Sequence, residues 1–218
     1  MLKDCGTYWL DYSVQGSPGW FTAREKKVTA STFGSLLDGV DKYTSYDDLL
    51  DIKLGLKKKT FTEYSKMAMA QGVKLEPEAR QWYIDNFTTD TMIVDVEEVG
   101  LAIPKFNDRI GGSPDGIVRI YDNSKKLLDT GLIEIKCPQR MYYGCKNYQG
   151  DQSIYGSHYA QMQGCMAIMD KSWCDYVVYV PDDDEVFSCR VLRNEDYWNY
   201  QLYPKICQFL KDWANGRQ

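Results

Sequence analysis

The chain has 218 residues, 44% of them hydrophobic and 26% charged, and a formal net charge of −5. This composition is typical of a soluble globular protein. No run of about 18 apolar residues and no basic leader occurs, so we expect neither a membrane span nor a secretion signal. Seven scattered cysteines without a CxxC pair, and a single histidine, His158, argue against a disulfide framework, a zinc site and a histidine metal cluster.

Positive and negative charges are segregated along the chain. Lysine and arginine gather in residues 23–27 and 53–66, whereas acids gather in residues 95–99 and 181–186. An acidic chain with segregated charges can still bind a polyanion on one face. A solvated, lysine-rich helix face explains the second basic segment equally well.

Capping residues and periodicity predict helices in the first part of the chain. Thr29 or Ser31 is the expected N-cap of the first helix, and Asp47 and Asp48 stand in the first turn of the second. The third contains Pro77, so we expect it to be kinked or split there. The predicted helices cover residues 28–39, 45–56 and 65–87.

From residue 92 the pattern changes to short strands, followed by a helix, a strand pair around the acidic turn 182–185, and a terminal helix. Asn194 is the expected N-cap of that last helix, with a break near Pro204. We therefore predict an α/β (α+β) fold with a mixed, mainly antiparallel sheet in a single domain, 1–218. Its parts are an N-terminal helical part (about 1–90), the sheet with its helix (about 91–192) and the C-terminal helix (about 194–216). The predicted elements cover residues 92–104, 109–121, 131–138, 157–170, 174–181, 185–193 and 194–216.

Two of these strands carry a candidate metal site. Asp115 stands in a Ser-Pro-Asp-Gly turn at the head of one strand, and the next strand reads LIEIKCP, with Glu134 and Lys136 on one face. A hairpin would bring Asp115 near Glu134, and two neighbouring carboxylates repel each other unless a cation lies between them. Oxygen ligands of this kind suit Mg²⁺ or Mn²⁺. A surface ion pair on an exposed sheet face would also account for Glu134 and Lys136.

These motifs resemble the λ-exonuclease-type (YqaJ-like) branch of the PD-(D/E)XK nuclease superfamily. The stretches SPDG and LIEIKCP are similar to its catalytic motif, including the Cys-Pro after the lysine. Residues 20–32, 72–79 and 159–166 are similar to three further motifs of this family, in the same order. The resemblance implies a restriction-endonuclease-like core with a central sheet flanked by helices.

The resemblance also implies roles for the catalytic residues. Asp115, Glu134 and the backbone carbonyl of Ile135 would hold Mg²⁺, with Mn²⁺ as a substitute, and Glu76 would complete a second metal position. Lys136 would orient or activate the attacking water. Gln161 would face the site from the following helix, and a shift in register to Gln163 stays open. Glu76 could equally be an acid that favours a helix start, and Gln161 a surface amide.

The DNA-binding residues are assigned in the same way. Arg24 matches the arginine that receives a terminal 5′-phosphate, a group that a guanidinium binds bidentately. Thr29 and Ser31 can add hydroxyl and backbone donors to the same phosphate, although simple helix capping also explains them. Lys57, Lys58 and Lys59 are candidate contacts to the DNA backbone. We expect Cys137 to serve packing and His158 not to act as a base.

Taken together, the resemblance implies a Mg²⁺-dependent deoxyribonuclease that resects linear double-stranded DNA 5′→3′ and leaves 3′ single strands. Two alternatives stay open: an endonuclease or single-strand nuclease on the same scaffold, and an inactive DNA-binding scaffold protein. The expected partners are double-stranded DNA ends and a single-strand annealing or recombination protein, with the chain acting as a ring trimer or a monomer. The expected location is intracellular, in a bacterial cytoplasm or the nucleus of an infected cell.

Overall fold

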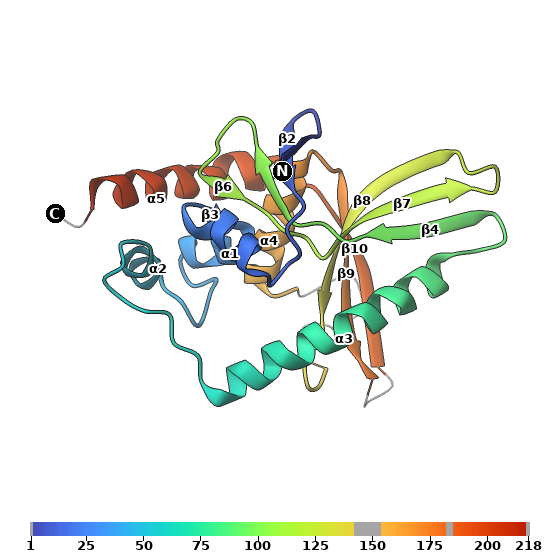
Figure 1. Cartoon of the computed structure of the whole chain (residues 1–218), viewed down its shortest axis with the longest axis horizontal. Coiled ribbons are helices and arrows are strands. Elements are labelled where there is room, and N and C mark those ends of the chain that lie inside the picture. Colours follow the sequence, from blue (N-terminus) through green and yellow to red (C-terminus); the bar gives the residue numbers. More distant parts are fainter. Residues whose placement is uncertain (1, 142–153, 182–184, 217–218) are drawn as a thin grey trace.

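A five-stranded sheet forms the centre of the protein, with strands in the order β10-β9-β8-β7-β4 (Figure 1). The computed structural model describes residues 2–141, 154–181 and 185–216. Three of the four strand pairings are antiparallel and the β8–β9 pairing is parallel, so the predicted mixed, mainly antiparallel sheet is confirmed. The strands are β4 (Met92–Glu97), β7 (Gly116–Asp122), β8 (Leu127–Lys136), β9 (Trp173–Val180) and β10 (Glu185–Leu192).

Helices cover both faces of this sheet and bury two apolar cores. The second half of helix α3 (Glu63–Phe87) packs on one face, and helices α4 (Gly156–Met169) and α5 (Tyr203–Asn215) belong to the core on the other (Figure 1). Strand β8 contributes to both cores by alternation, because Leu132 lies in the α4 core while Ile133 lies in the α3 core.

The first part of the chain contains strands that the sequence analysis did not predict. A second sheet of three strands has the order β1-β2-β5, and a short parallel pair joins β3 to β6. The expectation of a helical N-terminal part is therefore wrong for its first residues, which pair with a strand about ninety positions later. The unpredicted strands are β1 (Leu2–Asp4), β2 (Tyr8–Asp11) and β3 (Val28–Thr29), whereas their partners β5 (Leu101–Pro104) and β6 (Ile110–Gly111) lie in segments predicted as strands.

The helix predicted over residues 28–39 is instead strand β3 followed by a 3₁₀ helix, η1 (Ala30–Leu36). Ala30, Phe33 and Leu36 follow one another at intervals of three and are all buried. A 3₁₀ helix has three residues per turn, so it places all three side chains on one side, against α4. The tertiary packing therefore decides the helix type.

The other two N-terminal helices are α1 (Pro18–Glu25) and α2 (Tyr46–Lys53). Helix α2 confirms the second predicted helix and begins with a capping box between Ser45 and Asp48. Of the two predicted effects of Pro77, a kink or a split, the split does not occur, because helix α3 continues through this residue. Pro77 leaves the carbonyl of Val73 without its helical donor, and Val73 is exposed, so water can satisfy that carbonyl.

The last helix has the predicted N-cap, because the Asn194 side chain accepts a hydrogen bond from the backbone N–H of Tyr197 (2.9 Å). The segment begins as a π-helix, η4 (Tyr197–Leu202), and becomes α-helical as α5 one residue before Pro204, where the break was predicted. The acidic residues 182–184 lie outside the described residues. Within the described ranges, no helix combines the length and the apolar character needed to cross a bilayer.

A polar network around the buried residues Tyr83 and Asp175 fastens the second half of α3 to the sheet. The Tyr83 hydroxyl donates a hydrogen bond to Asp175 on β9. The guanidinium of Arg190 on β10 donates two hydrogen bonds, of 2.8 and 2.9 Å, to the same carboxylate. Tyr179 on β9 also donates to Glu78 on α3 (2.7 Å). These contacts set the height of α3 above the sheet.

Replacing Tyr83 with Phe should lower the free energy of unfolding by about 1–2 kcal/mol, because a buried hydrogen bond to a charged group is lost. Thermal or urea unfolding measures the change. Tyr200→Phe is the control, since Tyr200 is 77% exposed. Equal stabilities for the two variants would contradict the assignment.

Candidate active site

The pairing of β7 with β8 places Asp115 beside Glu134. Gly116 faces Ile133 across the pair, and the Asp115 backbone N–H donates to the Ile133 carbonyl (3.1 Å). The Asp115 side chain also accepts a hydrogen bond from the Ile135 backbone N–H (2.6 Å). Asp115 is thus held against β8, in the position that the predicted hairpin requires.

Glu134 is almost completely buried, with 1% of its surface exposed. One carboxylate oxygen contacts the Lys136 ammonium, and the other oxygen, Oε2, is buried without a hydrogen-bond partner among the described residues. Burial, together with the charge of Asp115, raises the pKa of Glu134 to about 8. A buried carboxylate oxygen without a partner, next to a second carboxylate, is the environment that a hard cation stabilises.

Glu76 faces this pair from helix α3. Its carboxylate accepts a hydrogen bond from Arg80, one helical turn later (2.7 Å), and Arg80 also contacts Glu98. Burial and the negative charge of Asp115 raise the pKa of Glu76 to about 7, although Arg80 opposes the shift. The three acids Glu76, Asp115 and Glu134 therefore influence one another's ionisation.

These side chains fit a divalent cation by their chemistry, but their present positions do not form a closed cage. Within residues 2–141, 154–181 and 185–216, no three side chains of His, Cys, Asp or Glu stand together as a ready-made metal cluster. Asp115 turns toward the Ile135 backbone, and Glu76 toward Arg80. The side chains of Asp115 and Glu76 would have to rotate for a metal to bind at Asp115, Glu134, the Ile135 carbonyl and Glu76.

The two glutamines of α4 have different surroundings. Gln163 is buried and links α4 to the C-terminal segment, because it donates to the Leu192 carbonyl and accepts from the Asn194 backbone N–H (both 2.8 Å). Gln161 shares a helix side with Cys165, four residues later. Burial and the charges of Glu134 and Asp115 raise the pKa of Cys165. That Gln161 faces the carboxylates stays a prediction.

Arg24 is the centre of a second group of polar side chains. Its guanidinium donates to the hydroxyls of Thr29 (3.1 Å) and Ser31 (2.9 Å), and more weakly to Ser113 (3.4 Å). The guanidinium also lies over the Trp20 ring, 3.9 Å from its centroid. We call these five residues the Arg24 pocket.

The Arg24 pocket has the character of an anion site. Burial lowers the pKa of Arg24 to about 10, which leaves it charged at neutral pH. No carboxylate of the described residues forms an ion pair with it, and its polar partners there are hydroxyl groups. A partly buried guanidinium without a counter-ion favours the binding of an anion such as phosphate.

Two members of the Arg24 pocket were not among the predicted site residues. Ser113 stands only two positions before Asp115, in the same turn, and its hydroxyl accepts hydrogen bonds from both Arg24 and Trp20. Trp20 stands one helical turn before Arg24 on α1. The sequence offered one signal for both residues: Trp20 lies in the motif of residues 20–32, and Ser113 lies in the SPDG stretch.

The three candidate lysines lie on the surface, in the segment between α2 and α3. Lys57 pairs with Asp48 (2.6 Å), and the Lys59 ammonium lies 5.3 Å from the centroid of the Phe61 ring. Lys58 is also exposed. The structure therefore places these lysines outside both the cluster of three acids and the Arg24 pocket.

His158 and Cys137 lie near the carboxylates but have packing roles. The Nδ1 atom of His158 forms a hydrogen bond with the Tyr176 hydroxyl (2.8 Å), and burial lowers the pKa of His158 to about 3. The imidazole is therefore neutral at physiological pH. Cys137 packs against the α3 core, as its position in the strand predicts.

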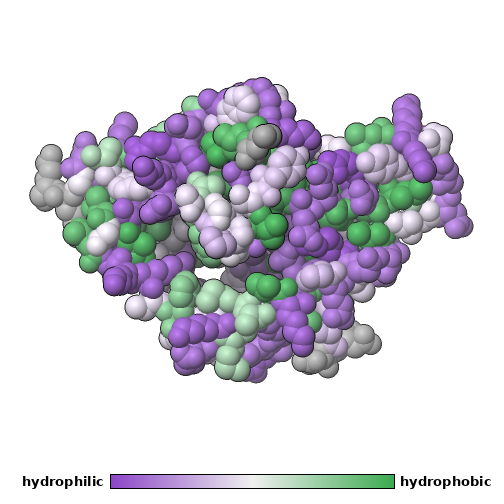
Figure 2. Space-filling view, in the orientation of Figure 1, coloured by the Kyte–Doolittle hydropathy of each residue, from purple (hydrophilic) through white to green (hydrophobic). Residues whose placement is uncertain are grey.

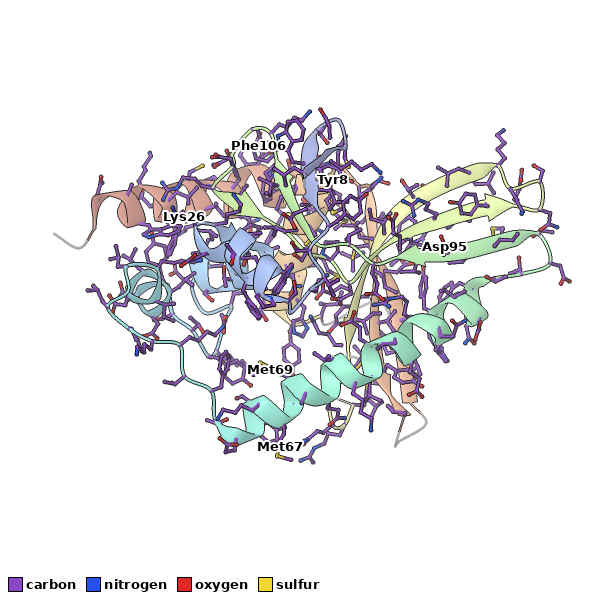
Figure 3. The ribbon with its side chains drawn as sticks, viewed as in Figure 1. Tyr8, Lys26, Met67, Met69, Asp95 and Phe106 are labelled. Carbon is purple, nitrogen blue, oxygen red and sulfur yellow. The ribbon has the colours of Figure 1, made fainter. Side chains whose placement is uncertain are left out.

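The first half of α3 lies outside both apolar cores. None of its residues before Ala79 is buried. Figure 2 shows an opening between this half of the helix and the part of the molecule that α1 and α2 form. In Figure 3, Met69 lies on the side of α3 toward this opening and Met67 on the opposite side.

The comparisons with known proteins agree with this geometry. The family described as "YqaJ-like viral recombinase domain" matches residues 19–172. The chain belongs to this family. The matched region includes the Arg24 pocket, the three acids, Lys136 and Gln161. No protein with a curated description matches the chain significantly.

Solved structures show the same fold. An alkaline exonuclease from Laribacter hongkongensis is 28% identical, with a TM-score of 0.67, over 91% of this chain and 93% of that chain. The same exonuclease in complex with dAMP is 29% identical, with the same coverage and TM-score. A phage-related exonuclease from Haemophilus somnus is 16% identical over 87% of this chain and 92% of that chain, with a TM-score of 0.54, and shows the likeness of fold alone.

The burial of Glu134 leads to a prediction about stability. The raised pKa means that the metal-free folded protein holds a proton on Glu134 that the unfolded chain releases above pH of about 4.5. The stability of the metal-free protein should therefore fall as the pH rises from about 5 to 8. Glu134→Gln, which is neutral at every pH, should reduce this fall, while Glu76, whose pKa is also raised, still contributes to it, and should raise the unfolding midpoint at pH 8 by a few °C.

Thermal unfolding in EDTA at pH 6 and pH 8 measures this effect. Added Mg²⁺ should stabilise the wild-type protein at pH 8 much more than the Gln variant. A Glu134→Gln variant that is less stable than wild type at pH 8 in EDTA would contradict the assignment.

Proposed function

We propose that this protein is a metal-dependent DNA exonuclease that removes nucleotides 5′→3′ from linear double-stranded DNA. The observation that carries the proposal is the short link between two sites. Ser113 belongs to the Arg24 pocket, and Asp115, two residues later, is one of the three acids Glu76, Asp115 and Glu134. Two residues span at most about 7 Å, which is close to one nucleotide step along a strand.

This spacing supports an exonuclease that acts at 5′ ends. A terminal 5′-phosphate bound at Arg24, Thr29, Ser31 and Ser113 would place the next phosphodiester near Asp115 and Glu134. Family membership and the similar exonuclease structures support hydrolysis of DNA. The dAMP complex of the Laribacter hongkongensis enzyme shows that a nucleoside monophosphate binds to that similar protein.

The roles of the side chains follow from their surroundings. A bound Mg²⁺ would neutralise the carboxylates and stabilise negative charge on the phosphate, and Glu76 would allow a second ion. Lys136, held beside Glu134, would orient the attacking water with its ammonium group. Attack on phosphorus breaks the bond to the 3′ oxygen and leaves a 5′-phosphate on the shortened strand. Gln161 would donate a hydrogen bond to the water or the phosphate.

The new 5′-phosphate would then occupy the Arg24 pocket in the next cycle. The other strand would remain as a 3′ single strand, a substrate for a single-strand annealing or recombination protein. The description of the family as a viral recombinase supports this use. Lys57, Lys58 and Lys59 would contact the DNA backbone, and a monomer or a ring trimer could carry out the reaction.

Asp115→Asn and Lys136→Ala should reduce hydrolysis of linear duplex DNA in Mg²⁺ by a factor on the order of 10²–10³ or more. Asp95→Asn, on the exposed edge strand β4 (Figure 3), is the matched control and should keep full activity. Circular dichroism should show that all three variants are folded. Full activity of either site variant would exclude the assigned site.

Arg24→Ala should slow degradation of 5′-phosphorylated ends by about 10–100-fold and affect 5′-hydroxyl ends much less, since only the former have a charged terminal group to bind. Duplexes labelled on one strand, with phosphate on either or neither 5′ end, measure the effect and the polarity. A covalently closed circle serves as the further substrate. Cleavage of the circle would favour an endonuclease, and equal losses on both kinds of end would remove the role of Arg24.

A further inference from the structure

Lys53, the last residue of α2, reaches across to the turn that follows α1. Its ammonium donates to the Lys27 carbonyl (2.6 Å) and, at the limit of a hydrogen bond, to the Glu25 carbonyl (3.5 Å). An ammonium group satisfies such carbonyls at the C-terminal end of a helix, where they lack helical donors. Lys53 therefore ties α2 to the end of α1.

The turn that Lys53 holds determines the shape of the Arg24 pocket. Only residues 25–27 separate Arg24 at the end of α1 from strand β3, which carries Thr29. Lys53 donates to two of these three residues. A change in the turn would alter the distance between the guanidinium of Arg24 and the hydroxyls of Thr29 and Ser31.

The surroundings of Lys53 are positively charged. Burial and the charge of Arg24 lower the pKa of Lys53 to about 8, with a smaller contribution from Lys59 and an opposing one from Glu25. No carboxylate of the described residues lies within ion-pair distance of the Lys53 ammonium. Two partly buried cations that influence each other's ionisation, and that form no ion pair with an acid among the described residues, favour the binding of an anion at this place.

Helix α5 contacts Lys53 through Trp213. The indole N–H of Trp213 donates to the Lys53 carbonyl (3.0 Å), and the Lys53 ammonium lies 5.3 Å from the centroid of that ring. Arg109 lies over the same ring, 5.0 Å from its centroid, and its backbone carbonyl accepts from the Val28 N–H (2.9 Å). Lys53 is thus fixed at the junction of α2, α5 and strand β3.

We propose that Lys53 is a positioning residue of the Arg24 pocket that sets the preference for phosphorylated 5′ ends. It holds the Glu25 and Lys27 carbonyls so that Arg24, Thr29 and Ser31 converge on one phosphate, and its charge adds to that of Arg24. This inference rests on the proposed function, in which the Arg24 pocket receives a 5′-phosphate. Lys53 itself acts through the turn and does not touch the reacting phosphodiester.

The test compares wild type with Lys53→Met, Lys53→Arg and Lys211→Met. Arginine keeps the charge and can donate to both carbonyls, whereas methionine keeps only the aliphatic stem. Lys211 is an exposed lysine of α5 and is the matched control. Initial rates on 5′-phosphorylated and 5′-hydroxyl duplexes, at several DNA concentrations, give kcat and KM for each end, and thermal unfolding checks that each variant is folded.

Lys53→Met should raise KM for phosphorylated ends and lower the ratio of phosphate to hydroxyl activity by about tenfold, while kcat at saturating DNA changes little. Lys53→Arg should restore most of the ratio, and Lys211→Met should leave it at the wild-type value. A folded Lys53→Met variant with the wild-type ratio would overturn the inference and leave the exonuclease proposal standing. An equal loss on both ends, without recovery in Lys53→Arg, would overturn it as well.

A wild-type protein without exonuclease activity would refute the proposed function instead. Lys53 would then be judged by calorimetric binding of a short 5′-phosphorylated single strand against the same strand with a 5′-hydroxyl. Preferential binding of the phosphorylated strand by wild type, lost in Lys53→Met, would support the role in the pocket. If neither wild type nor Lys53→Met distinguished the two strands, or if both preferred the phosphorylated strand to the same extent, that role would be excluded.

Discussion

The placement of the half-buried Asp115 beside the buried Glu134 is the constraint on which the rest of the site depends. Like charges this close in a poorly solvated position cannot both ionise without a compensating cation. The register between β7 and β8 imposes the juxtaposition, because a slip of one residue would turn Glu134 and Lys136 to the opposite face of the sheet. Lys136 compensates part of this negative charge and contacts one oxygen of Glu134, while the other oxygen stays available.

The second half of helix α3 packs on the sheet and the first half does not, and Glu76 lies between the two halves. The second half is anchored to the sheet through Tyr83 and Asp175, and it supplies Arg80, which limits the repulsion between Glu76 and Asp115. The first half contributes no buried residue. The helix can therefore hold an acidic side chain at a defined place above the sheet and still leave an opening toward solvent.

The charge distribution reconciles an acidic chain with a polyanionic substrate. Arg24 and Lys53 bring positive charge close to the carboxylates, and neither forms an ion pair with an acid of the described residues. The turn from Ser113 to Asp115 joins this positive region to the negative one over a very short distance. In the proposed function, a phosphate chain laid across the turn would contact the hydroxyls and the guanidinium first, and would reach the carboxylates one nucleotide step later.

The sequence by itself determined the features that depend on neighbouring residues, such as the alternation of a strand and the start of a helix. Strand alternation placed Glu134 and Lys136 on one face, and the first-turn acids Asp47 and Asp48 and the cap at Asn194 marked helix starts, because each signal depends on residues only a few positions apart. The tertiary structure alone decided the rest. The 3₁₀ form of η1 follows from its packing on α4, and the contact between Arg24 and Ser113 joins residues 89 positions apart. Lys53 and the turn after α1 also meet only through folding, since no periodicity or cap in the sequence links a lysine to carbonyls 26 and 28 positions earlier.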